Sequence, residues 1–282
     1  MSMRLVFADM DDTFLTHDKR VGEGNLKAIE RMAEAGVEFV PCSGRPVSGI
    51  PREALETPAT HYAVSSNGAA VNRLGADGEV EVLRRRLMAA DDVLAIYDAL
   101  RGHHVTFDVF VDGTAYAERW RYEHLDEYIA DPATVGAYKR MRTLIDEDVP
   151  ALLAGGEGVE KVTLFWTDEA DRDLTLSLID ANPRLTWASS VSNNIEFSDV
   201  DATKGSGLVW LAGHLGVPVA DTVSFGDNLN DVSMLKAAGT GVAMGNATPE
   251  AKAAADEVTL DCDHDGVGAW VMCELDREAA EA

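Results

Sequence analysis

The residues best suited to catalysis or metal binding are the carboxylates of the segment Asp9–Thr13, which reads DMDDT. The segment follows a short apolar run, Arg4–Ala8, and this pattern predicts a buried strand that ends where the carboxylates begin. Two carboxylates one residue apart can take different roles, with Asp9 as a nucleophile and Asp11 as a carrier of protons. Carboxylate oxygens also suit Mg²⁺. Because acidic turns are common, the segment alone equally fits a solvated turn or a helix cap.

A hydroxyl and a guanidinium follow the second predicted strand, 37–41. Ser43, Gly44 and Arg45 stand directly after it. They offer a hydroxyl, backbone N–H groups in a flexible turn and a cationic fork, all of which can bind phosphate oxygens. Taken alone, the same three residues fit an ordinary turn.

A lysine and a second group of carboxylates occur near the end of the chain. Lys204 precedes the predicted helix 205–215, and Asp227 and Asp231 follow the predicted strand 222–225. A lysine can bind phosphate as a point charge, and the carboxylates could hold a metal. Taken individually, Lys204 also fits an ordinary surface lysine, and Asp227 and Asp231 also fit residues at the N-terminus of a helix.

Strands and helices alternate in the first and last thirds of the chain, which predicts a doubly wound, mostly parallel α/β sheet. The predicted strands are 4–8, 37–41, 61–64, 222–225, 241–244 and 257–260, and the predicted helices are 25–35, 205–215, 231–238 and 249–255. The polar segments follow the carboxyl ends of strands, where open α/β sheets bind their ligands. We therefore expect the chemically active residues to meet at one edge of this sheet.

The middle of the chain has a different pattern and predicts an inserted α+β domain with an antiparallel sheet. Residues 105–111 and 114–118 flank Asp112-Gly113, a strong hairpin signal, and 120–129 has the pattern of a helix. The prediction divides the chain into a core of residues 1–83 and 191–282 and an insert of residues 84–190. The insert contains four aromatic residues that are expected to form its core: Phe107, Phe110, Tyr116 and Trp120.

Composition narrows the class of partner. The chain has 282 residues, with 24 Lys and Arg against 49 Asp and Glu, so its formal net charge is −25. This balance argues against binding to nucleic acid and to anionic membranes. Three widely spaced cysteines without a CxxC pair predict neither a disulfide framework nor a zinc site and fit a reducing cytoplasm. The sequence shows no signal peptide and no membrane-spanning run, so we expect a cytoplasmic protein; its oligomeric state stays open.

One acidic segment imitates a calcium loop. Asp261–Gly266 reads DCDHDG, like the start of an EF-hand loop, but the twelfth position is Met272 instead of the bidentate glutamate. The sequence therefore does not predict calcium binding there.

Four segments in fixed order resemble the motifs of the haloacid dehalogenase superfamily of phosphatases. They read FADMDDTFL, VPCSGRP, DATKGSGL and VSFGDNLNDVSML, and SSNGAAV, GVAMGNA and GVGAW add to the likeness. The resemblance is to the Cof-type, or class IIB, branch, in which a large α/β cap is inserted between the second and third motifs. Asp12 stands where many members of the superfamily have glycine, a change that this branch often accepts.

The resemblance implies a role for each catalytic residue. Asp9 would attack phosphorus and form an aspartyl-phosphate, and Asp11 would protonate the leaving alcohol and then activate water. Ser43 would bind the phosphoryl group, and Lys204 would balance the charge of Asp9 and the phosphoryl oxygens.

The resemblance also implies Mg²⁺ as cofactor and a phosphate-binding set. The implied metal residues are Asp9, Asp11 through its backbone carbonyl, Asp227, and Asp231 from nearby. The implied substrate-binding residues are Ser43, Gly44, Arg45, Asn67, Lys204 and Asn230.

The sequence therefore predicts a Mg²⁺-dependent phosphatase of a small phosphorylated metabolite, such as a sugar phosphate or a cofactor phosphate. A phosphomutase of the same superfamily would use the same residues, so this alternative stays open. A receiver domain of signalling proteins also uses acidic residues and a lysine, but it is about half this length at most. A scaffold that keeps the fold without catalysis is a third alternative, against which the intact motifs weigh. The substrate stays open, because the insert is expected to select it.

Overall fold

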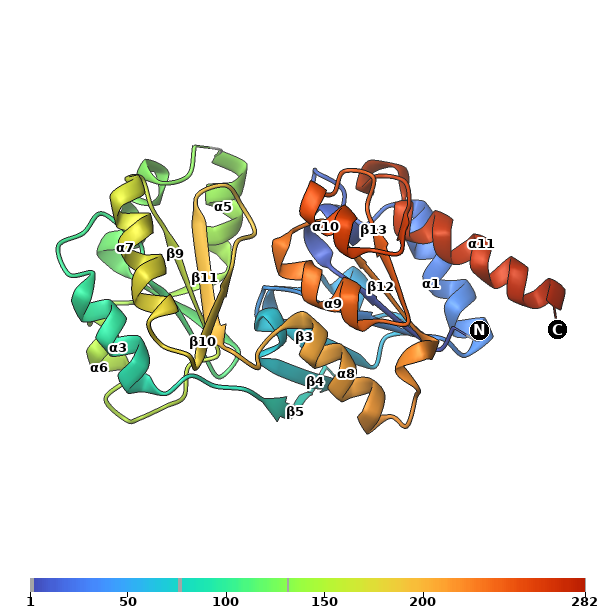
Figure 1. Cartoon of the computed structure of the whole chain (residues 1–282), viewed down its shortest axis with the longest axis horizontal. Coiled ribbons are helices and arrows are strands. Elements are labelled where there is room, and N and C mark those ends of the chain that lie inside the picture. The colour runs from blue at the N-terminus through green and yellow to red at the C-terminus, as the bar shows by residue number, and fades with distance from the viewer. Residues whose placement is uncertain (1–2, 76–77, 131, 282) are drawn as a thin grey trace. The chain divides into compact units, whose positions relative to one another are not determined.

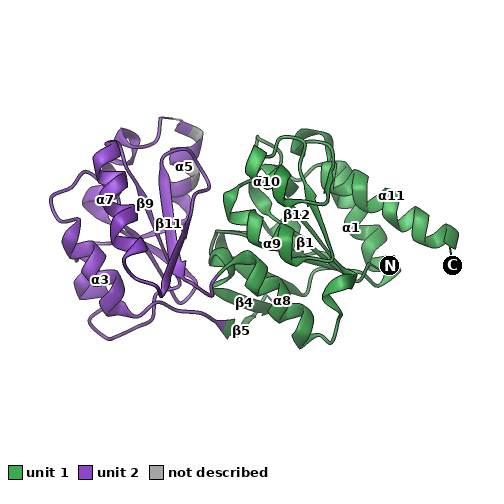
Figure 2. Ribbon diagram, in the orientation of Figure 1, with its two compact units in different colours: residues 1–84, 203–282 green, residues 85–202 purple. Residues whose placement is uncertain are grey.

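The computed structural model describes residues 3–75, 78–130 and 132–281. They form two compact units (Figure 2). The core unit comprises the described residues up to Arg84 and from Thr203 onward, and the insert unit runs from Arg85 to Ala202. Among the described residues, no helix is both long enough and apolar enough to cross a membrane.

The core unit is built on a five-stranded parallel sheet in the order β14-β13-β12-β1-β2. Its strands are β1 (Leu5–Ala8), β2 (Glu38–Pro41), β12 (Thr222–Gly226), β13 (Thr240–Ala243) and β14 (Glu257–Val258). A smaller three-stranded sheet contains β3 (Tyr62–Ser65), β4 (Ala70–Leu74) and β5 (Val80–Arg85). The predicted parallel α/β core is confirmed.

Helices cover both faces of the parallel sheet (Figure 1). They are α1 (Glu23–Ala35), α2 (Arg52–Leu55), α8 (Lys204–His214), α9 (Val232–Ala237), α10 (Pro249–Ala254) and α11 (Gly266–Glu281). Strand β1 is buried on both sides, because Val6 and Ala8 pack in one apolar cluster with α1 and α11 while Leu5 and Phe7 pack in another with α8 and α9. Alternate side chains of a strand point to opposite faces, so a continuous apolar run is what a doubly covered strand requires.

The insert unit contains a six-stranded sheet in the order β10-β11-β9-β6-β7-β8, antiparallel except for the parallel pair β7–β8. Its strands are β6 (Asp108–Val111), β7 (Thr114–Glu118), β8 (Arg142–Ile145), β9 (Lys161–Phe165), β10 (Leu185–Ala188) and β11 (Asn194–Asp199). Its helices are α3 (Ala90–Ala99), α4 (Arg119–Glu123), α5 (Pro132–Arg140), α6 (Val149–Leu152) and α7 (Glu169–Asp180). The expected α+β insert with an antiparallel sheet is confirmed.

The division between the units differs from the predicted one at its second boundary. Residues 191–202 were expected in the core, but β11 pairs with both β9 and β10 of the insert sheet. Ile195 and Phe197 pack in the apolar cluster of the insert, which explains why this strand belongs there. The first boundary falls after Arg84, one residue later than predicted.

Two expectations for the insert are corrected in detail. The helix expected over 120–129 is the shorter α4 followed by a 3₁₀ turn over Leu125–Glu127. Trp120 was expected in the core, yet 57% of it is exposed, and its indole N–H donates to Glu118. An aromatic residue with an N–H donor is well suited to such a half-solvated position.

Candidate active site

The first two motifs and the fourth follow three neighbouring strands of the parallel sheet. Asp9 follows β1 directly, Ser43 lies two residues after β2, and Asp227 follows β12. The register pairs Ala8 with Pro41 on one side and with Phe225 on the other, so the three strands end level with one another. The carboxyl ends of parallel strands are where such folds place their ligand sites, and the expected meeting of these residues at one edge follows from this topology.

Lys204 joins two of the predicted acidic residues. Its side chain is fully buried, and Nζ donates to Asp9 Oδ1 at 2.5 Å and to Asp231 Oδ1 at 2.6 Å. The lysine is the first residue of α8, whose N-terminus is capped by Thr203 and Ser206. The cap fixes where the helix begins and therefore where the lysine enters the site.

A glycine allows the neighbouring loop to approach this helix start. Gly68 has a φ of +98°, and a Cβ atom there would lie 2.0 Å from the carbonyl oxygen of Thr203. Any larger residue would push the loop away from Lys204, which explains the glycine in the segment SSNG.

Asp231 organises the turn after β12. Its Oδ2 accepts hydrogen bonds from the backbone N–H groups of Asp227, at 2.9 Å, and of Asn228, at 3.0 Å. The hydroxyl of Thr13 donates to Asp227 Oδ1 at 2.8 Å and so links the first motif to the fourth. With Lys204 on Oδ1, both oxygens of Asp231 are engaged by the chain itself.

The site holds more negative than positive charge. Asp9, Asp227 and Asp231 each offer a carboxylate oxygen, and these oxygens lie within 4.8 Å of one another. Burial raises the pKa of Asp9 well above its usual value although Lys204 opposes the rise, and burial followed by the charge of Asp231 raises the pKa of Asp227 to about 7. Burial alone would lower the pKa of Lys204, but the two carboxylates outweigh it and raise that pKa. One ammonium does not neutralise three buried carboxylates, and an oxygen-rich group with this excess charge fits a small, hard divalent cation.

The side chain of Asp11, unlike the three buried carboxylates, is paired with two cations. Arg45 donates to both of its oxygens, at 2.8 Å from Nε and 2.6 Å from Nη2, and Lys19 Nζ lies 3.3 Å from Oδ1. Burial raises the pKa of Asp11, but the hydrogen bonds and charges of Arg45 and Lys19 outweigh burial and lower that pKa overall. The guanidinium that was predicted to bind phosphate therefore pairs with the predicted proton carrier.

The remaining predicted phosphate-binding residues lie in three loops that are joined by hydrogen bonds. Ser43 is buried, its hydroxyl accepts from the N–H of Arg45, and its carbonyl oxygen accepts from the N–H of Asn67. Gly44 lies between Ser43 and Arg45 in the same loop. The side-chain amide of Asn230 donates to Asn67 Oδ1 at 3.3 Å, which connects the segment SSNG to the fourth motif.

Thr13, Lys19 and Asn246 contact this network through their side chains and had no predicted role. Thr13 binds Asp227, Lys19 binds Asp11 and Asp12, and Asn246 donates to the carbonyl oxygen of Asp12 at 2.8 Å. Thr13 belongs to the first motif, so its place at the site could have been predicted from the sequence. Asn246 belongs to the segment GVAMGNA, which adds to the family likeness, although no role was predicted for it. Lys19 has ordinary sequence surroundings, and only the folded chain brings it to the acidic turn.

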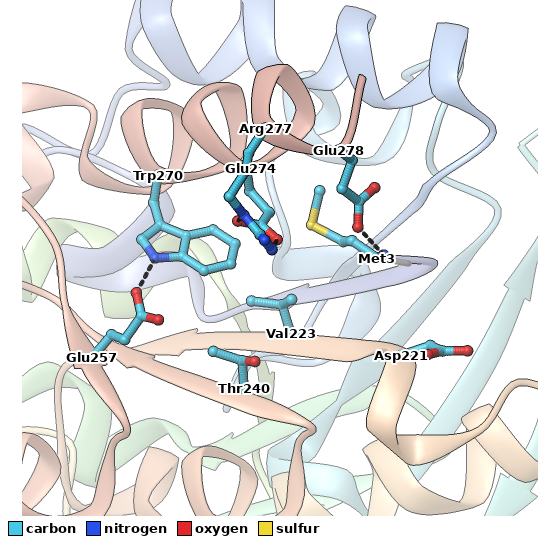
Figure 3. Close-up of a pocket in the computed structure, with 9 residues that line it drawn as sticks. All are labelled: Met3, Asp221, Val223, Thr240, Glu257, Trp270, Glu274, Arg277 and Glu278. Carbon is cyan, nitrogen blue, oxygen red and sulfur yellow. Dashed lines mark hydrogen bonds and ion pairs between the residues drawn. The ribbon is translucent and has the colours of Figure 1, made fainter. Parts of the chain in front are cut away.

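A hollow of about 310 Å³ lies at the opposite, amino-terminal edge of the parallel sheet (Figure 3). Its lining consists of Met3, Asp221, Val223, Thr240, Glu257, Trp270, Glu274, Arg277 and Glu278. Polar groups of this lining bind one another, with Trp270 donating to Glu257 and Arg277 to Glu274. No predicted catalytic residue lines it, so we assign the chemistry to the carboxyl edge.

Comparison with known proteins agrees with this assignment. The family model described as haloacid dehalogenase-like hydrolase matches residues 6–271. The chain therefore belongs to this family of hydrolases, and the resemblance of its four motifs is confirmed.

Similar proteins match along nearly their whole length. The phosphatase YwpJ of Bacillus subtilis is 29% identical, with 94% of this chain and 97% of the relative covered. The pyridoxal phosphate phosphatase YbhA of Escherichia coli is 27% identical over 98% of this chain and 100% of the relative. The HMP-PP phosphatase of Klebsiella pneumoniae is 26% identical over 97% and 96%, respectively.

Among solved structures, a haloacid dehalogenase-like hydrolase from B. subtilis superposes with a TM-score of 0.83 at 26% identity, covering 96% of this chain and 99% of the other. A sugar phosphatase of subclass IIB superposes with a TM-score of 0.78 at 22% identity, covering 96% and 98%, and shares the fold.

Proposed function

We propose that this chain is a Mg²⁺-dependent phosphatase that hydrolyses a small phosphorylated metabolite through an aspartyl-phosphate on Asp9. The observation that carries the proposal is the fully buried Lys204, whose ammonium contacts both Asp9 and Asp231 in a cluster that also contains Asp227. Burying charges is costly, and a cluster with this excess of carboxylates is best explained by chemistry that brings further positive charge.

The cation would be held by Asp9 and Asp227, with the backbone carbonyl of Asp11 as a further ligand. Asp231 belongs to the same acidic group, but its engaged oxygens suit a positioning role for Asp227 and Lys204. When bound, Mg²⁺ would stabilise the charge that develops on the phosphoryl oxygens.

The reaction would proceed in two displacements. A carboxylate oxygen of Asp9 forms a bond to phosphorus as the bond between phosphorus and the substrate oxygen breaks, and Asp11 gives that oxygen its proton. Asp11 then takes a proton from water, the water oxygen attacks phosphorus, and Asp9 is released with inorganic phosphate. Lys204 balances charge on Asp9 throughout, and the Ser43 hydroxyl and Asn230 amide donate to phosphoryl oxygens.

Arg45 has to change partners in this scheme. It engages both oxygens of Asp11, so it blocks Asp11 from carrying a proton to a leaving group. A bound phosphoryl group offers Arg45 other oxygen acceptors, which would free Asp11 when substrate arrives.

The substrate class rests on the similar proteins and on the insert unit. The names of two relatives include pyridoxal phosphate and HMP-PP, which supports a cofactor phosphate, and a subclass IIB neighbour named as a sugar phosphatase keeps sugar phosphates in the class. We assign substrate selection to residues 85–202, because this unit has an apolar core of its own and contains none of the predicted catalytic or metal-binding residues. The three cysteines are free thiols, which fits the cytoplasm.

Asp9→Asn tests the nucleophile. An amide cannot attack phosphorus, so the variant should lose at least about a thousandfold in phosphate release while its circular dichroism stays native. Asp18→Asn is the matched control, because Asp18 is exposed and its carboxylate pairs with the neighbouring, exposed Arg20. Turnover of Asp9→Asn within about tenfold of the control would refute the assignment. Free inorganic phosphate as product distinguishes a phosphatase from a phosphomutase, which returns phosphate to its substrate.

A further inference from the structure

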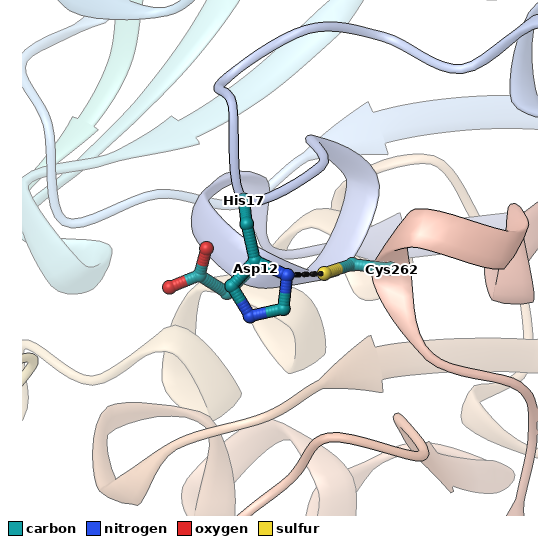
Figure 4. Close-up of side chains that lie close together, drawn as sticks. All are labelled: Asp12, His17 and Cys262. Carbon is teal, nitrogen blue, oxygen red and sulfur yellow. Dashed lines mark hydrogen bonds between the residues drawn. The ribbon is translucent and has the colours of Figure 1, made fainter.

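A second group of metal-ligating side chains lies beside the catalytic turn and has no part in the proposed reaction (Figure 4). Asp12, His17 and Cys262 each offer one ligand atom, and these atoms lie within 4.8 Å of one another. Asp12 follows Asp11 in the turn Met10–Phe14, His17 belongs to the loop that leaves this turn, and Cys262 begins a 3₁₀ turn before α11. The segment that imitates a calcium loop therefore contributes a thiol to a mixed cluster.

The nitrogen and the sulfur are close to the spacing of two ligands on one ion. His17 Nδ1 lies 3.3 Å from Cys262 Sγ. In a tetrahedral zinc site with bonds of about 2.3 Å to sulfur and about 2.1 Å to nitrogen, these atoms would be about 3.6 Å apart. An ion between them requires a shift of only a few tenths of an ångström.

Neighbouring residues hold the three ligands in place. The Asn246 side chain donates to the carbonyl oxygen of Asp12 at 2.8 Å and accepts from the N–H of Cys262 at 3.1 Å. Asp263 accepts from the N–H of His17 at 3.0 Å, and its other oxygen lies 2.8 Å from His17 Nδ1. The contacts of Asn246 and the backbone contact of Asp263 orient the ligands. The second Asp263 oxygen contacts the ligand nitrogen itself, so it has to leave Nδ1 when an ion binds there, and it is placed to become the fourth ligand.

We propose that Asp12, His17 and Cys262 form a second metal site that takes a divalent transition ion of the zinc class. The donor set separates it from the catalytic cluster, because thiolate and imidazole select zinc-class ions while an all-carboxylate group suits Mg²⁺. The Cys262 sulfur would bind as thiolate, and its proton leaves to solvent as the metal–sulfur bond forms. His17 is 57% exposed, which gives the ion a path from solvent to the buried sulfur.

Lys19 is the competing cation. Its Nζ lies 2.9 Å from Asp12 Oδ1, so an incoming ion has to share this carboxylate or displace the lysine. The bound ion would tie the turn Met10–Phe14 to the turn before α11, and it should therefore raise the melting temperature of the protein.

Cobalt(II) tests the site with a signal that the catalytic cluster cannot give. The full chain is titrated with Co²⁺ in excess Mg²⁺, and one ion per chain should produce the near-ultraviolet charge-transfer absorption of a thiolate-bound cobalt. Zn²⁺ should then remove the band by displacement. Cys262→Ser should lose the band, whereas Cys273→Ser, which changes the exposed cysteine of α11, should keep it.

A second pair of variants guards against misfolding of the buried cysteine change. His17→Ala should weaken Co²⁺ binding about tenfold or more, and His264→Ala, at an exposed histidine of the same region, should leave it unchanged. Failure of the wild-type chain to give the band, a band that survives in Cys262→Ser, or equal binding by the two histidine variants would each overturn the proposal.

Discussion

The repulsion among the buried carboxylates gives a prediction that does not depend on knowing the substrate. Asp227 lies in a buried group with Asp9 and Asp231, and burial and the charge of Asp231 raise the pKa of Asp227 from 3.8 to about 7. Asp227→Asn removes one charge and keeps the size of the side chain. The Asn oxygen can still accept the hydroxyl hydrogen bond of Thr13, so the structural cost of the change should be small.

The magnitude follows from the link between proton binding and folding. A rise of the pKa from 3.8 to about 7 corresponds to about 4 kcal/mol, since each pH unit is worth about 1.4 kcal/mol. The folded protein binds this proton more tightly than the unfolded chain does. The stabilising contribution is therefore complete below about pH 4, and it is lost as the pH rises through about 7.

Without added metal, Asp227→Asn should thus be more stable than the wild type at about pH 8, by up to about 4 kcal/mol, and the difference should narrow to about 2 kcal/mol at pH 5. Millimolar Mg²⁺ should narrow the difference at pH 8. It stabilises the wild type by binding the folded state, and the variant lacks one of the charged ligands.

Urea unfolding followed by circular dichroism measures both effects, at a series of pH values between 5 and 8, in EDTA and in Mg²⁺. Asp18→Asn again serves as the control for loss of an exposed carboxylate. If the stabilities of Asp227→Asn and wild type change in parallel with pH, then Asp227 is not destabilised by its neighbours. If Mg²⁺ stabilises both equally, then Asp227 is not a metal ligand.

Three further predictions concern the proposed reaction. Arg45→Ala should raise the pKa of Asp11, so this proton-donating carboxyl should stay protonated up to a higher pH. The descending limb of the pH profile of kcat/KM should then move to higher pH, and an unmoved profile would argue against the Arg45–Asp11 pairing. EDTA should abolish phosphate release, Mg²⁺ should restore it, and Ca²⁺ should substitute poorly, so that full activity in a verified metal-free sample would contradict the metal assignment. Exchange of residues 85–202 for the insert of a relative with another substrate should transfer the substrate ranking, and a folded chimera with the original ranking would place selection in the core unit.

Much of the core unit could be predicted because its signals are local. Strand β1 is one apolar run followed by carboxylates, and the predicted meeting of the first, second and fourth motifs follows from the parallel sheet alone. The burial of Lys204 could not be predicted from its surroundings, since a lysine before a helix is usually exposed. It follows from the two carboxylates that only the fold brings to it.

The features that the sequence did not reveal depend on distant partners. β11 has strand-like alternation, but its membership of the insert sheet is decided by pairing with β9 and β10. The proximity of His17 and Cys262 joins residues 245 positions apart, and no spacing rule for metal ligands covers such a pair. Cysteine spacing alone therefore argued against a zinc site, because it does not show that the fold brings Cys262 next to His17.

The arrangement of cations also explains how a chain of net charge −25 could act on an anion. A phosphorylated substrate is repelled at long range by the protein as a whole, so it has to be held by a few local charges. Lys204 and Arg45 are both already paired with carboxylates of the site. If these cations are to turn toward a phosphoryl group, their carboxylates need another source of positive charge, and a divalent ion at Asp9 and Asp227 would supply it. Metal and substrate should therefore bind with mutual reinforcement, because each makes the charge of the other easier to accommodate in the same buried space.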